Sequence, residues 1–337
     1  MRNKVFIVAE LSANHNGDIQ VALDTIRAAK RAGADAVKIQ TYTADTLTID
    51  CKNNYFKINH GTAWDGEYLY DLYKRAYTPW KWHAEIFNVA NDEGIICFSS
   101  PFDNTAVDLL EELKNPIYKI ASFEIQDIPL ISYAASKGKP MILSTGIAEI
   151  EDIELAIDTC RKAGNNNITV LKCTSAYPAE PKDSNLLTIP DIKERFGVKV
   201  GISDHTMGIV GPVVATALGG TLIEKHFILD KSIGGPDAHF SLDEKEFTEM
   251  VKAVRIAESM IGKVDYQMTE KKKKSRQFSR SLFIVKDVKA GEKITRENVR
   301  SIRPGFGMHP KYLSEILGKE FNQDFEKGTP INFENIN

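Results

Sequence analysis

Eight apolar, strand-like runs recur between residues 4 and 226, and most are separated by stretches with helical periodicity. Short connections between alternating strands and helices favour parallel strands joined by right-handed crossovers. Eight such units predict an α/β fold of the (β/α)8 TIM-barrel type. A doubly wound open sheet is the alternative, weakened because no GxGxxG motif follows the first run. The strands are expected near residues 4–9, 35–40, 95–99, 117–120, 141–144, 168–173, 198–202 and 220–224.

The chain is predicted to hold two domains because the pattern changes after Gly262. A helix expected over residues 242–261 ends there, and the polar, lysine-rich residues 263–279 are interpreted as a linker. Short β-like pieces with turns fill residues 280–337. A barrel over residues 1–262 would thus precede a small β-rich module. A core of that size is marginal alone, so we expect it to dock onto the barrel or a partner subunit.

One connection is too long for the barrel pattern. Residues 41–78 form an inserted segment rich in aromatic side chains, and a helix is expected to start near Pro79. Long insertions on barrels are often functional lids, but aromatic packing over the barrel flank is an equal alternative. The aromatic and histidine residues of the segment include Tyr55, Phe56, His60, Trp64, Tyr68, Tyr70 and Tyr73.

Composition excludes several classes of partner. A formal net charge of −3 gives no electrostatic case for nucleic acid or an acidic membrane, and the short basic run at 271–274 is interpreted as part of the linker. No apolar signal region and no run of about 18 apolar residues is present, so we expect an unexported, cytoplasmic protein. Four cysteines without CxxC spacing suit a reducing cytosol. Cys173, at a strand end, is interpreted as a buried structural thiol rather than a nucleophile.

Polar and ionisable residues end the strand-like runs, and in a TIM barrel these ends meet at one mouth. His205 and His226 end the seventh and eighth runs. Two neighbouring imidazoles can chelate one divalent metal while leaving positions open for water or substrate. The alternative is that each histidine is a hydrogen-bonded structural residue. An open two-histidine site suits polarisation of a substrate carbonyl, with Mn²⁺ or Mg²⁺ favoured and Co²⁺ as a further candidate.

Ammonium and hydroxyl groups around the mouth would form a receptor for phosphate and carboxylate. Lys38 and Gln40 share one strand face, while Val37 and Ile39 occupy the other. Lys38 is therefore predicted to point into the barrel, where it needs an anionic partner. Extension to solvent is the alternative for such a lysine, and it suffices for Lys172. The receptor is predicted to comprise Lys38, Lys119, Ser122, Ser144 and Ser203.

Three carboxylates, Glu10, Glu124 and Asp237, are candidates for binding sugar hydroxyls and moving protons. Glu10 could instead simply pair with an interior lysine. Asp237 lies with His239 in a Gly- and Pro-containing loop that should lie near His226 at the mouth.

Ten ordered segments make the sequence recognisable over nearly its whole length. They are AELSANHNG (9–17), VKIQTY (37–42), FSSPFD (98–103), YKIASFE (118–124), LSTG (143–146), KCTSAYP (172–178), GISDHT (201–206), EKHF (224–227), GGPDAHFS (234–241) and RSIRPGFG (300–307). In these segments the chain resembles the sialic acid synthase family. The resemblance implies a barrel followed by an antifreeze-like (SAF) domain. It also implies condensation of phosphoenolpyruvate with an N-acetylated hexosamine-type aldose, with release of phosphate.

The resemblance also implies roles for individual residues. His205 and His226 match the metal pair. Arg303 matches an arginine that the SAF domain of a neighbouring subunit extends over the sugar, and Phe278 matches an aromatic residue beside that arginine. These matches imply a domain-swapped homodimer. Positions around phosphoenolpyruvate match Lys38, Ser100, Lys119, Ser122, Ser144 and Ser203. Positions near the aldehyde and sugar match Glu10, Gln40, Glu124, Tyr177 and Asp237.

Some motif positions depart from the N-acetylneuraminate branch of the family. Leu11, Ser12 and Ala13 stand where that branch has Gly before Asn-His, and Ser175 stands where it has Asn. These segments look like the pseudaminic acid branch, whose acceptor is 2,4-diacetamido-2,4,6-trideoxy-L-altrose. Loss of the larger Asn amide at Ser175 could make room for the second acetamido group. N-acetylneuraminate or legionaminate synthesis is the alternative.

The implied reaction is an aldol-like condensation in which the C–O bond of phosphoenolpyruvate breaks, with Glu10 as the candidate for proton management. A catalytically inactive barrel with a binding or regulatory role is an alternative of a different class. It would require loss of site residues, and all motif positions but the Asn are filled. A lyase that forms a Schiff base at Lys38 or Lys119 is a third interpretation.

Overall fold

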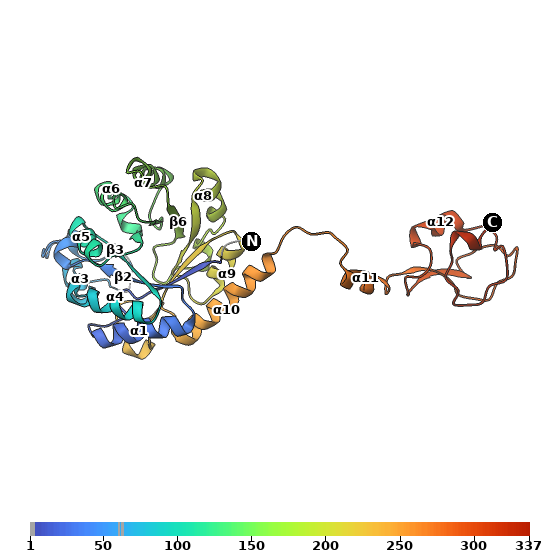
Figure 1. Ribbon diagram of the computed structural model, residues 1–337, viewed down its shortest axis with the longest axis horizontal. Helices are drawn as coiled ribbons and strands as arrows, with labels where there is room; N and C mark the ends of the chain where they lie inside the picture. Colours follow the sequence, from blue (N-terminus) through green and yellow to red (C-terminus); the bar gives the residue numbers. More distant parts are fainter. Residues whose placement is uncertain (1–3, 60, 62–63) are drawn as a thin grey trace. The chain divides into compact units, whose positions relative to one another are not determined.

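The computed structural model describes residues 4–59, 61 and 64–337. The chain divides into two compact units, Met1–Gly262 and Lys263–Asn337. The first unit runs from blue to orange and the second from orange to red in Figure 1. None of the helices among the described residues is both long and apolar enough to cross a bilayer.

The first unit is a closed barrel of eight parallel strands, in the order β1 to β8. The predicted TIM-barrel fold is confirmed. The predicted strand ends fell up to two residues short, so the polar residues expected after the strands lie inside them. The strands are β1 (Phe6–Glu10), β2 (Ala36–Thr41), β3 (Ile96–Pro101), β4 (Tyr118–Ile120), β5 (Met141–Ser144), β6 (Ile168–Cys173), β7 (Lys199–Asp204) and β8 (Leu222–His226).

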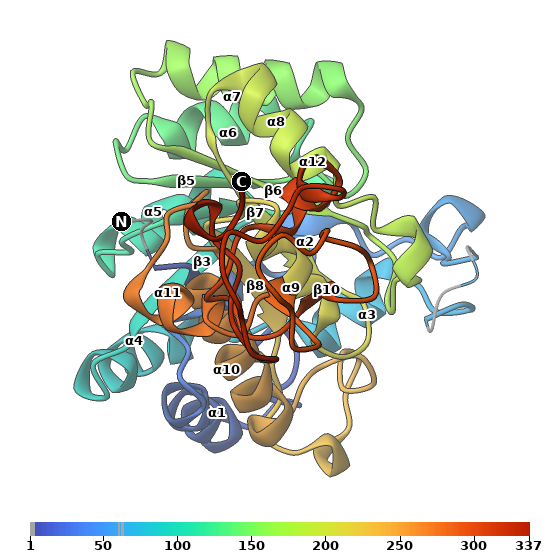
Figure 2. The same ribbon diagram turned by 90° about the vertical axis from the view of Figure 1, so that its right-hand side faces the viewer.

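Helices surround the strands, as Figure 2 shows for α1, α4 and α6 to α8. Helix α1 begins after Asp18, whose side chain accepts a hydrogen bond from Gln20, and ends at Gly33 in the left-handed conformation. Helix α10 begins with a capping box between Asp243 and Glu246. The barrel helices are α1 (Ile19–Ala32), α4 (His83–Asp92), α5 (Asn104–Glu112), α6 (Ile128–Ala135), α7 (Ile150–Lys162), α8 (Thr188–Phe196), α9 (Val210–Ala217) and α10 (Glu244–Ile261).

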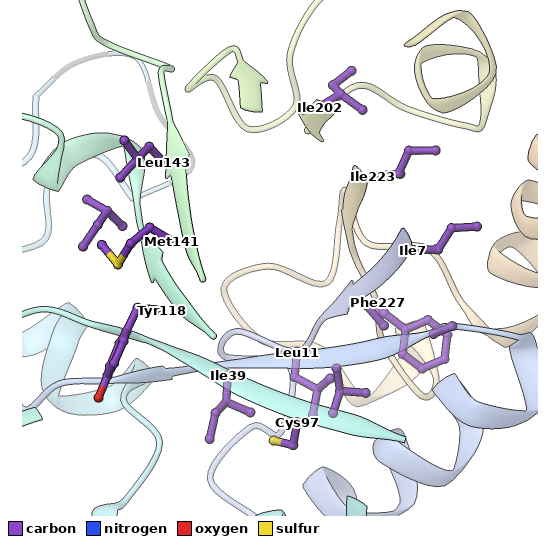
Figure 3. Packing of buried hydrophobic residues seen from close by; sticks show 14 of the residues in the cluster. Ile7, Leu11, Ile39, Cys97, Tyr118, Met141, Leu143, Ile202, Ile223 and Phe227 are labelled. Carbon is purple, nitrogen blue, oxygen red and sulfur yellow. The ribbon is translucent and has the colours of Figure 1, made fainter. Parts of the chain in front are cut away.

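Alternation along the strands divides the core into two parts. Side chains that face the helices form a shell around the barrel; Figure 3 labels several, among them Ile7, Ile39 and Ile223. Side chains that face inward form a smaller apolar layer at the strand starts. This inner layer comprises Val8, Ala36, Phe98, Ile142, Leu171 and Leu222. The next inward positions are polar on five of these six strands, with Cys173 on β6 as the exception, so the apolar layer is the floor of the candidate site.

The inserted segment adds structure for which no helix was predicted. It contains α2 (Ala44–Leu47) and α3 (Leu69–Ala76), with a bridge between Lys57 and Tyr68. Helices α2 and α3 pack against each other. His60, one of the residues singled out in this segment, lies outside the described residues. Helix α4 starts at His83 after a 3-10 turn at Trp80–Trp82, four residues later than Pro79 suggested.

The second unit is small and β-rich. Strands β9 (Ser281–Ile284) and β10 (Val299–Ile302) pair antiparallel, and Phe283 bridges Pro330. Helix α12 (Leu313–Ile316) is short, and α11 (Glu270–Arg276) lies within the residues interpreted as a linker. The core comprises Leu282, Ile284, Val288, Ile294, Val299, Met308, Ile316, Phe321 and Ile331.

Candidate active site

Four buried charged groups lie above the apolar floor of the barrel. Strand register places Glu10 beside both Lys38 and His226, and Ser203 beside Glu224. Lys119, on β4, reaches the same interior. We call Glu10, Lys38, Lys119 and Glu224 the charge quartet. Its members are each at most 5% exposed, so its two positive and two negative charges must be satisfied by one another or by a ligand.

Lys38 is the centre of one half of the quartet. Its Nζ lies 2.5 Å from Glu10 Oε2 and 3.8 Å from Glu224 Oε1, and it donates to Ser100 Oγ at 3.3 Å. The prediction that Lys38 points into the barrel toward an anionic partner is confirmed. Burial raises the pKa of Glu10 although Lys38 opposes the shift. Glu10 is therefore easier to protonate than an ordinary carboxyl group.

Glu224 is the centre of the other half, and sequence analysis assigned it no role. Lys119 Nζ donates to both of its carboxylate oxygens, at 2.8 and 2.9 Å, and Ser203 Oγ donates to Oε1 at 3.0 Å. Burial alone would raise the pKa of Glu224, but Lys119 and Lys38 lower it to about 2. Glu224 therefore favours its ionised form between two lysines, and an anion bound to these lysines would share them with it.

The serines predicted for the receptor lie along the same rim. Ser100, Ser122, Ser144 and Ser203 are all buried. Gly146 N donates to Ser122 Oγ at 3.0 Å, and a Cβ on Gly146 would approach that oxygen to 2.7 Å. Ser144 Oγ is buried without a partner among the described residues. Such a hydroxyl is unfavourable unless a ligand or water completes its hydrogen bond.

His205 and His226 face each other, with ring centroids 5.3 Å apart. His205 Nδ1 lies 3.0 Å from the Thr174 carbonyl oxygen. Because a carbonyl only accepts, Nδ1 carries the proton and Nε2 keeps a free lone pair. Burial lowers the pKa of His226 well below its usual value, and its Nδ1 is buried without a partner among the described residues. Burial alone would lower the pKa of His205, but the neighbouring Cys173 raises it. The neutral imidazole of His226, and that of His205 in its deprotonated form, each offer a nitrogen lone pair that fits a divalent cation.

Other side chains fix the histidine pair or share its surroundings. The Tyr177 ring lies 4.3 Å from the His205 ring, and the Phe240 ring lies 4.9 Å from the His226 ring. Burial alone would raise the pKa of Cys173, but His205, 3.7 Å away, lowers it to about 7. Across the described part of the chain, no group of three or more His, Cys, Asp or Glu side chains gathers for a metal. A cation here would rely on the histidine pair plus water or substrate.

A further buried ion pair joins the ends of β7 and β8, on the side of these strands that faces the helices. Lys225 Nζ donates to Asp204 Oδ2 at 2.6 Å and also to the Thr206 carbonyl. Asp204 Oδ1 accepts from the backbone N and hydroxyl of Thr206, at 3.1 and 2.8 Å. A Cβ on Gly211 would meet this carboxylate at 2.9 Å, so α9 can approach only with glycine there. The pair ties β7 to β8 directly behind the two histidines.

The loop after β1 is joined to the loop after β8. Asn14 Nδ2 donates to the Phe227 carbonyl at 2.9 Å and to Ser241 Oγ at 2.8 Å. Ala13 N donates to Asp237 Oδ2 at 3.3 Å. These bonds hold Asp237 at the mouth, buried as its predicted role requires, whereas the neighbouring His239 is exposed.

A cavity of about 420 Å³ opens at the mouth. Its polar lining includes Ser12, Gln40, Glu124, Tyr177 and Asp237, together with His226 and Ser122. Gln40 donates to Glu10 Oε1 at 3.2 Å and to Ser12 Oγ at 3.1 Å, which links the cavity to the charge quartet. Burial raises the pKa of Glu124 to about 7.

The barrel therefore brings together fourteen of the sixteen residues predicted for the site, and their roles remain predictions. Ser175 lies close to Gly146 at the rim, outside the described lining of the mouth cavity. Phe278 and Arg303 belong to the second unit, where both are exposed. Their approach to a barrel of a partner subunit stays a prediction. Sequence analysis assigned no role to Ser12, Asp204, Glu224 or Lys225, which the structure places at or beside the site.

A barrel with an interior charge quartet and a two-histidine mouth, followed by a small β-rich unit, is the architecture expected of sialic acid synthases. Residues 25–266 match the NeuB family, and residues 279–337 match the SAF domain. The chain belongs to the NeuB family, and the resemblance identified from its motifs is confirmed.

Two relatives and one solved structure illustrate this membership. The chain is 50% identical over 328 residues to a pseudaminic acid synthase of Campylobacter jejuni subsp. jejuni serotype O:23/36 (strain 81-176), covering 97% of this chain and 95% of the relative. It is 37% identical over 339 residues to an N,N'-diacetyllegionaminic acid synthase of Legionella pneumophila, covering 98% and 94%. The fold matches the crystal structure of a Leptospira borgpetersenii N-acetylneuraminic acid synthetase in complex with citrate with a TM-score of 0.72. That match is 31% identical and covers 81% of this chain and 90% of the other.

Proposed function

We propose that the chain is a pseudaminic acid synthase. It condenses phosphoenolpyruvate with 2,4-diacetamido-2,4,6-trideoxy-L-altrose and releases phosphate, forming a nine-carbon 2-keto acid. The single observation that carries this proposal is 50% identity over 97% of the chain to a pseudaminic acid synthase, with the charge quartet and histidine pair in place.

Lys38 and Lys119 are the groups that would bind phosphoenolpyruvate. Both ammonium groups lie in the barrel interior, beside hydroxyls of Ser100 and Ser203. Ammonium and hydroxyl donors in a desolvated site orient phosphate and carboxylate and stabilise charge that develops on them. Attack by C3 of phosphoenolpyruvate on the sugar aldehyde leaves C2 to be captured by water, after which the C–O bond to phosphate breaks.

His205 and His226 would hold a divalent cation, Mn²⁺ or Mg²⁺ by preference. When bound, such an ion supplies Lewis-acid polarisation of an aldehyde oxygen. Glu10 is assigned to proton transfer, because its pKa is raised by burial and Gln40 links it to the acceptor cavity. Gln40, Glu124, Tyr177 and Asp237 would orient the sugar.

The active assembly is proposed to be a domain-swapped homodimer in the cytoplasm. Arg303 and Phe278 of one subunit would complete the sugar site of the other. Their exposure in the second unit, and the small core of that unit, support this arrangement. Size-exclusion chromatography with light scattering tests it, and a monomer that retains full activity would contradict it.

The acceptor is tested by steady-state kinetics with a panel of open-chain-forming sugars. The panel contains the proposed L-altrose derivative, the diacetamido precursor of legionaminic acid and N-acetylmannosamine, with products identified by NMR. We expect the highest kcat/KM for the L-altrose derivative. A preference for either other sugar would move the chain to the legionaminate or neuraminate branch.

The bond that breaks is tested separately by reaction in ¹⁸O-labelled water. Cleavage of the C–O bond leaves the released phosphate unlabelled, because phosphate keeps the bridging oxygen of phosphoenolpyruvate. Isotope-shifted ³¹P NMR reads the phosphate directly. Label in phosphate would exclude the proposed cleavage. Loss of activity in EDTA, without covalent trapping by borohydride, would separate this reaction from a Schiff-base lyase.

A further inference from the structure

One wall of the mouth cavity comes from the inserted segment and differs in character from the rest. Leu47 ends α2, Leu69 and Leu72 belong to α3, and Ile58 lies between the two helices. We call these four residues the apolar wall. Among the described lining residues of the segment, Lys57 alone carries a charge. The lining from strand ends and their loops includes Ala13, Phe102 and Phe123 but also the polar groups of Gln40, Glu124 and Asp237.

The apolar wall is stabilised by hydrogen bonds within the inserted segment and contacts the barrel through aromatic rings. Ile58 N donates to the Glu67 carbonyl, and Gly66 N donates to the Ile58 carbonyl, each at 2.9 Å. The Tyr42 ring, at the end of β2, packs edge-on against the rings of Tyr73 and Phe102, 5.9 and 5.2 Å away.

Two members of the wall, Ile58 and Leu72, are each 7% exposed. The segment thus lines the mouth cavity with these residues, and its part in the site stays a prediction.

We infer that the apolar wall is a specificity subsite for the 6-methyl group of the acceptor sugar. This inference rests on the proposed function and names the part of the substrate that the segment recognises. The reacting aldehyde at C1 must face the polar strand ends, where His226 and Gln40 lie. The other end of the six-carbon chain, C6, is then directed away from them, toward the wall.

The chemistry of the proposed acceptor fits this division of the cavity. Its C6 carries no hydroxyl, and a methyl group gains by leaving water for contact with leucine and isoleucine side chains. A 6-hydroxyl group placed there would lose its hydrogen bonds to water without finding replacements on the wall. An apolar pocket discriminates such analogues by about 10- to 200-fold in kcat/KM. The wall therefore selects 6-deoxy acceptors over their 6-hydroxy counterparts.

The test compares two acceptors that differ only at C6. They are 2,4-diacetamido-2,4,6-trideoxy-L-altrose and 2,4-diacetamido-2,4-dideoxy-L-altrose. Full-length wild type is compared with Leu69→Asn and Leu47→Asn, both at half-buried positions of the wall. Leu69→Met keeps the wall apolar, and Ile49→Asn changes an exposed residue of the same segment outside the cavity. Circular dichroism reports whether each variant keeps its fold, and the KM for phosphoenolpyruvate reports whether its phosphoenolpyruvate site is intact.

We expect wild type, Leu69→Met and Ile49→Asn to prefer the 6-deoxy sugar. In Leu69→Asn and Leu47→Asn, kcat/KM for the 6-deoxy sugar should fall about tenfold. The ratio of kcat/KM for the 6-deoxy sugar to that for the 6-hydroxy sugar should fall by a similar factor. The KM for phosphoenolpyruvate should not change. Two wall variants are used so that misfolding of one does not end the test.

The outcomes distinguish failure of the subsite from failure of the proposed function. If wild type uses the 6-deoxy sugar but both Asn variants keep its full preference, the subsite is overturned and the proposed function stands. If wild type uses neither diacetamido-L-altrose sugar and accepts N-acetylmannosamine instead, the proposed function fails and the subsite fails with it. Equal use of both C6 forms by wild type also overturns the subsite.

Discussion

The two units of the chain differ in whether they bury ion pairs. The barrel buries three pairs, Lys38–Glu10, Lys119–Glu224 and Lys225–Asp204, with every partner at most 6% exposed. In the second unit, Lys289 and Asp324 form a pair whose side chains are 82% and 59% exposed. The buried polar residues described in this unit, Ser281 and Asn298, carry no charge.

The difference shows where the molecule accepts an energetic penalty. Burying an ion pair removes two charges from water, and attraction between them often fails to recover that loss. A barrel with a large apolar shell can tolerate three such pairs, whereas a core as small as that of the second unit has little stability to lose. Two of the buried pairs lie in the candidate site and the third lies directly behind it, so the buried charge of the barrel is concentrated at the site.

Breaking the charge quartet should have the largest effect. In Lys119→Met, the proposed phosphoenolpyruvate site loses one ammonium group. Glu224 keeps the hydrogen bond from Ser203 and, of its two lysines, only Lys38, 3.8 Å away. We expect kcat/KM for phosphoenolpyruvate to fall by about 100- to 1,000-fold. Lys172→Met is the matched control, because Lys172 donates to the Cys173 carbonyl instead of reaching the quartet. Equal losses in the two variants would contradict a specific role for Lys119.

Breaking the pair behind the histidines should mainly affect stability. Lys225→Met leaves Asp204 charged and buried, which costs about 3–5 kcal/mol of unfolding free energy. The urea unfolding midpoint measures it. Adding Asp204→Asn should recover part of the loss, because the buried charge is then gone while an oxygen remains to accept from Thr206. No recovery in the double variant would show that the lysine acts through packing rather than through its charge.

Glu124 should make barrel stability depend on pH. Burial raises its pKa from 4.5 in the unfolded chain to about 7, so folding favours the protonated form. Its contribution is complete below pH 4.5 and is lost as pH rises through 7, by up to about 3 kcal/mol. Glu124→Gln should therefore gain stability relative to wild type between pH 5 and pH 8. The exposed substitution Glu112→Gln is the control, and parallel pH curves for wild type and Glu124→Gln would refute the shift.

The exposed pair of the second unit should show the smallest effect. Asp324→Asn removes the ion pair with Lys289 but keeps an oxygen that can accept from Ala290 N. Solvated pairs of this kind contribute little to stability. We expect no measurable shift of the urea midpoint at low or high salt. A clear loss would mean that the second unit depends on charge more than its geometry indicates.

Strand parity could have revealed more of the site than sequence analysis took from it. The alternation that placed Lys38 and Gln40 on the inner face also puts Glu224 on the face of His226, and Asp204 and Lys225 on the outer face. Applied to every strand, it predicts both the quartet and the pair behind it. Glu224 received no role because only His226 of the eighth run was considered for the site.

Other features could not be predicted from local patterns. Leu69 and Leu72 follow helical spacing in the sequence, but only contacts at the barrel mouth join them with Leu47 and Ile58 into one wall. Tertiary packing, rather than propensity, decides the structure of such a segment. The eight strands were predictable because burial on both faces leaves continuous apolar runs in the sequence.

The position of Glu224 bears on how turnover ends. Its carboxylate accepts two hydrogen bonds from the Lys119 ammonium group. If phosphoenolpyruvate binds at Lys119 as proposed, the released phosphate would face an intramolecular competitor for the same ammonium group. A built-in counter-ion of this kind would favour departure of the product.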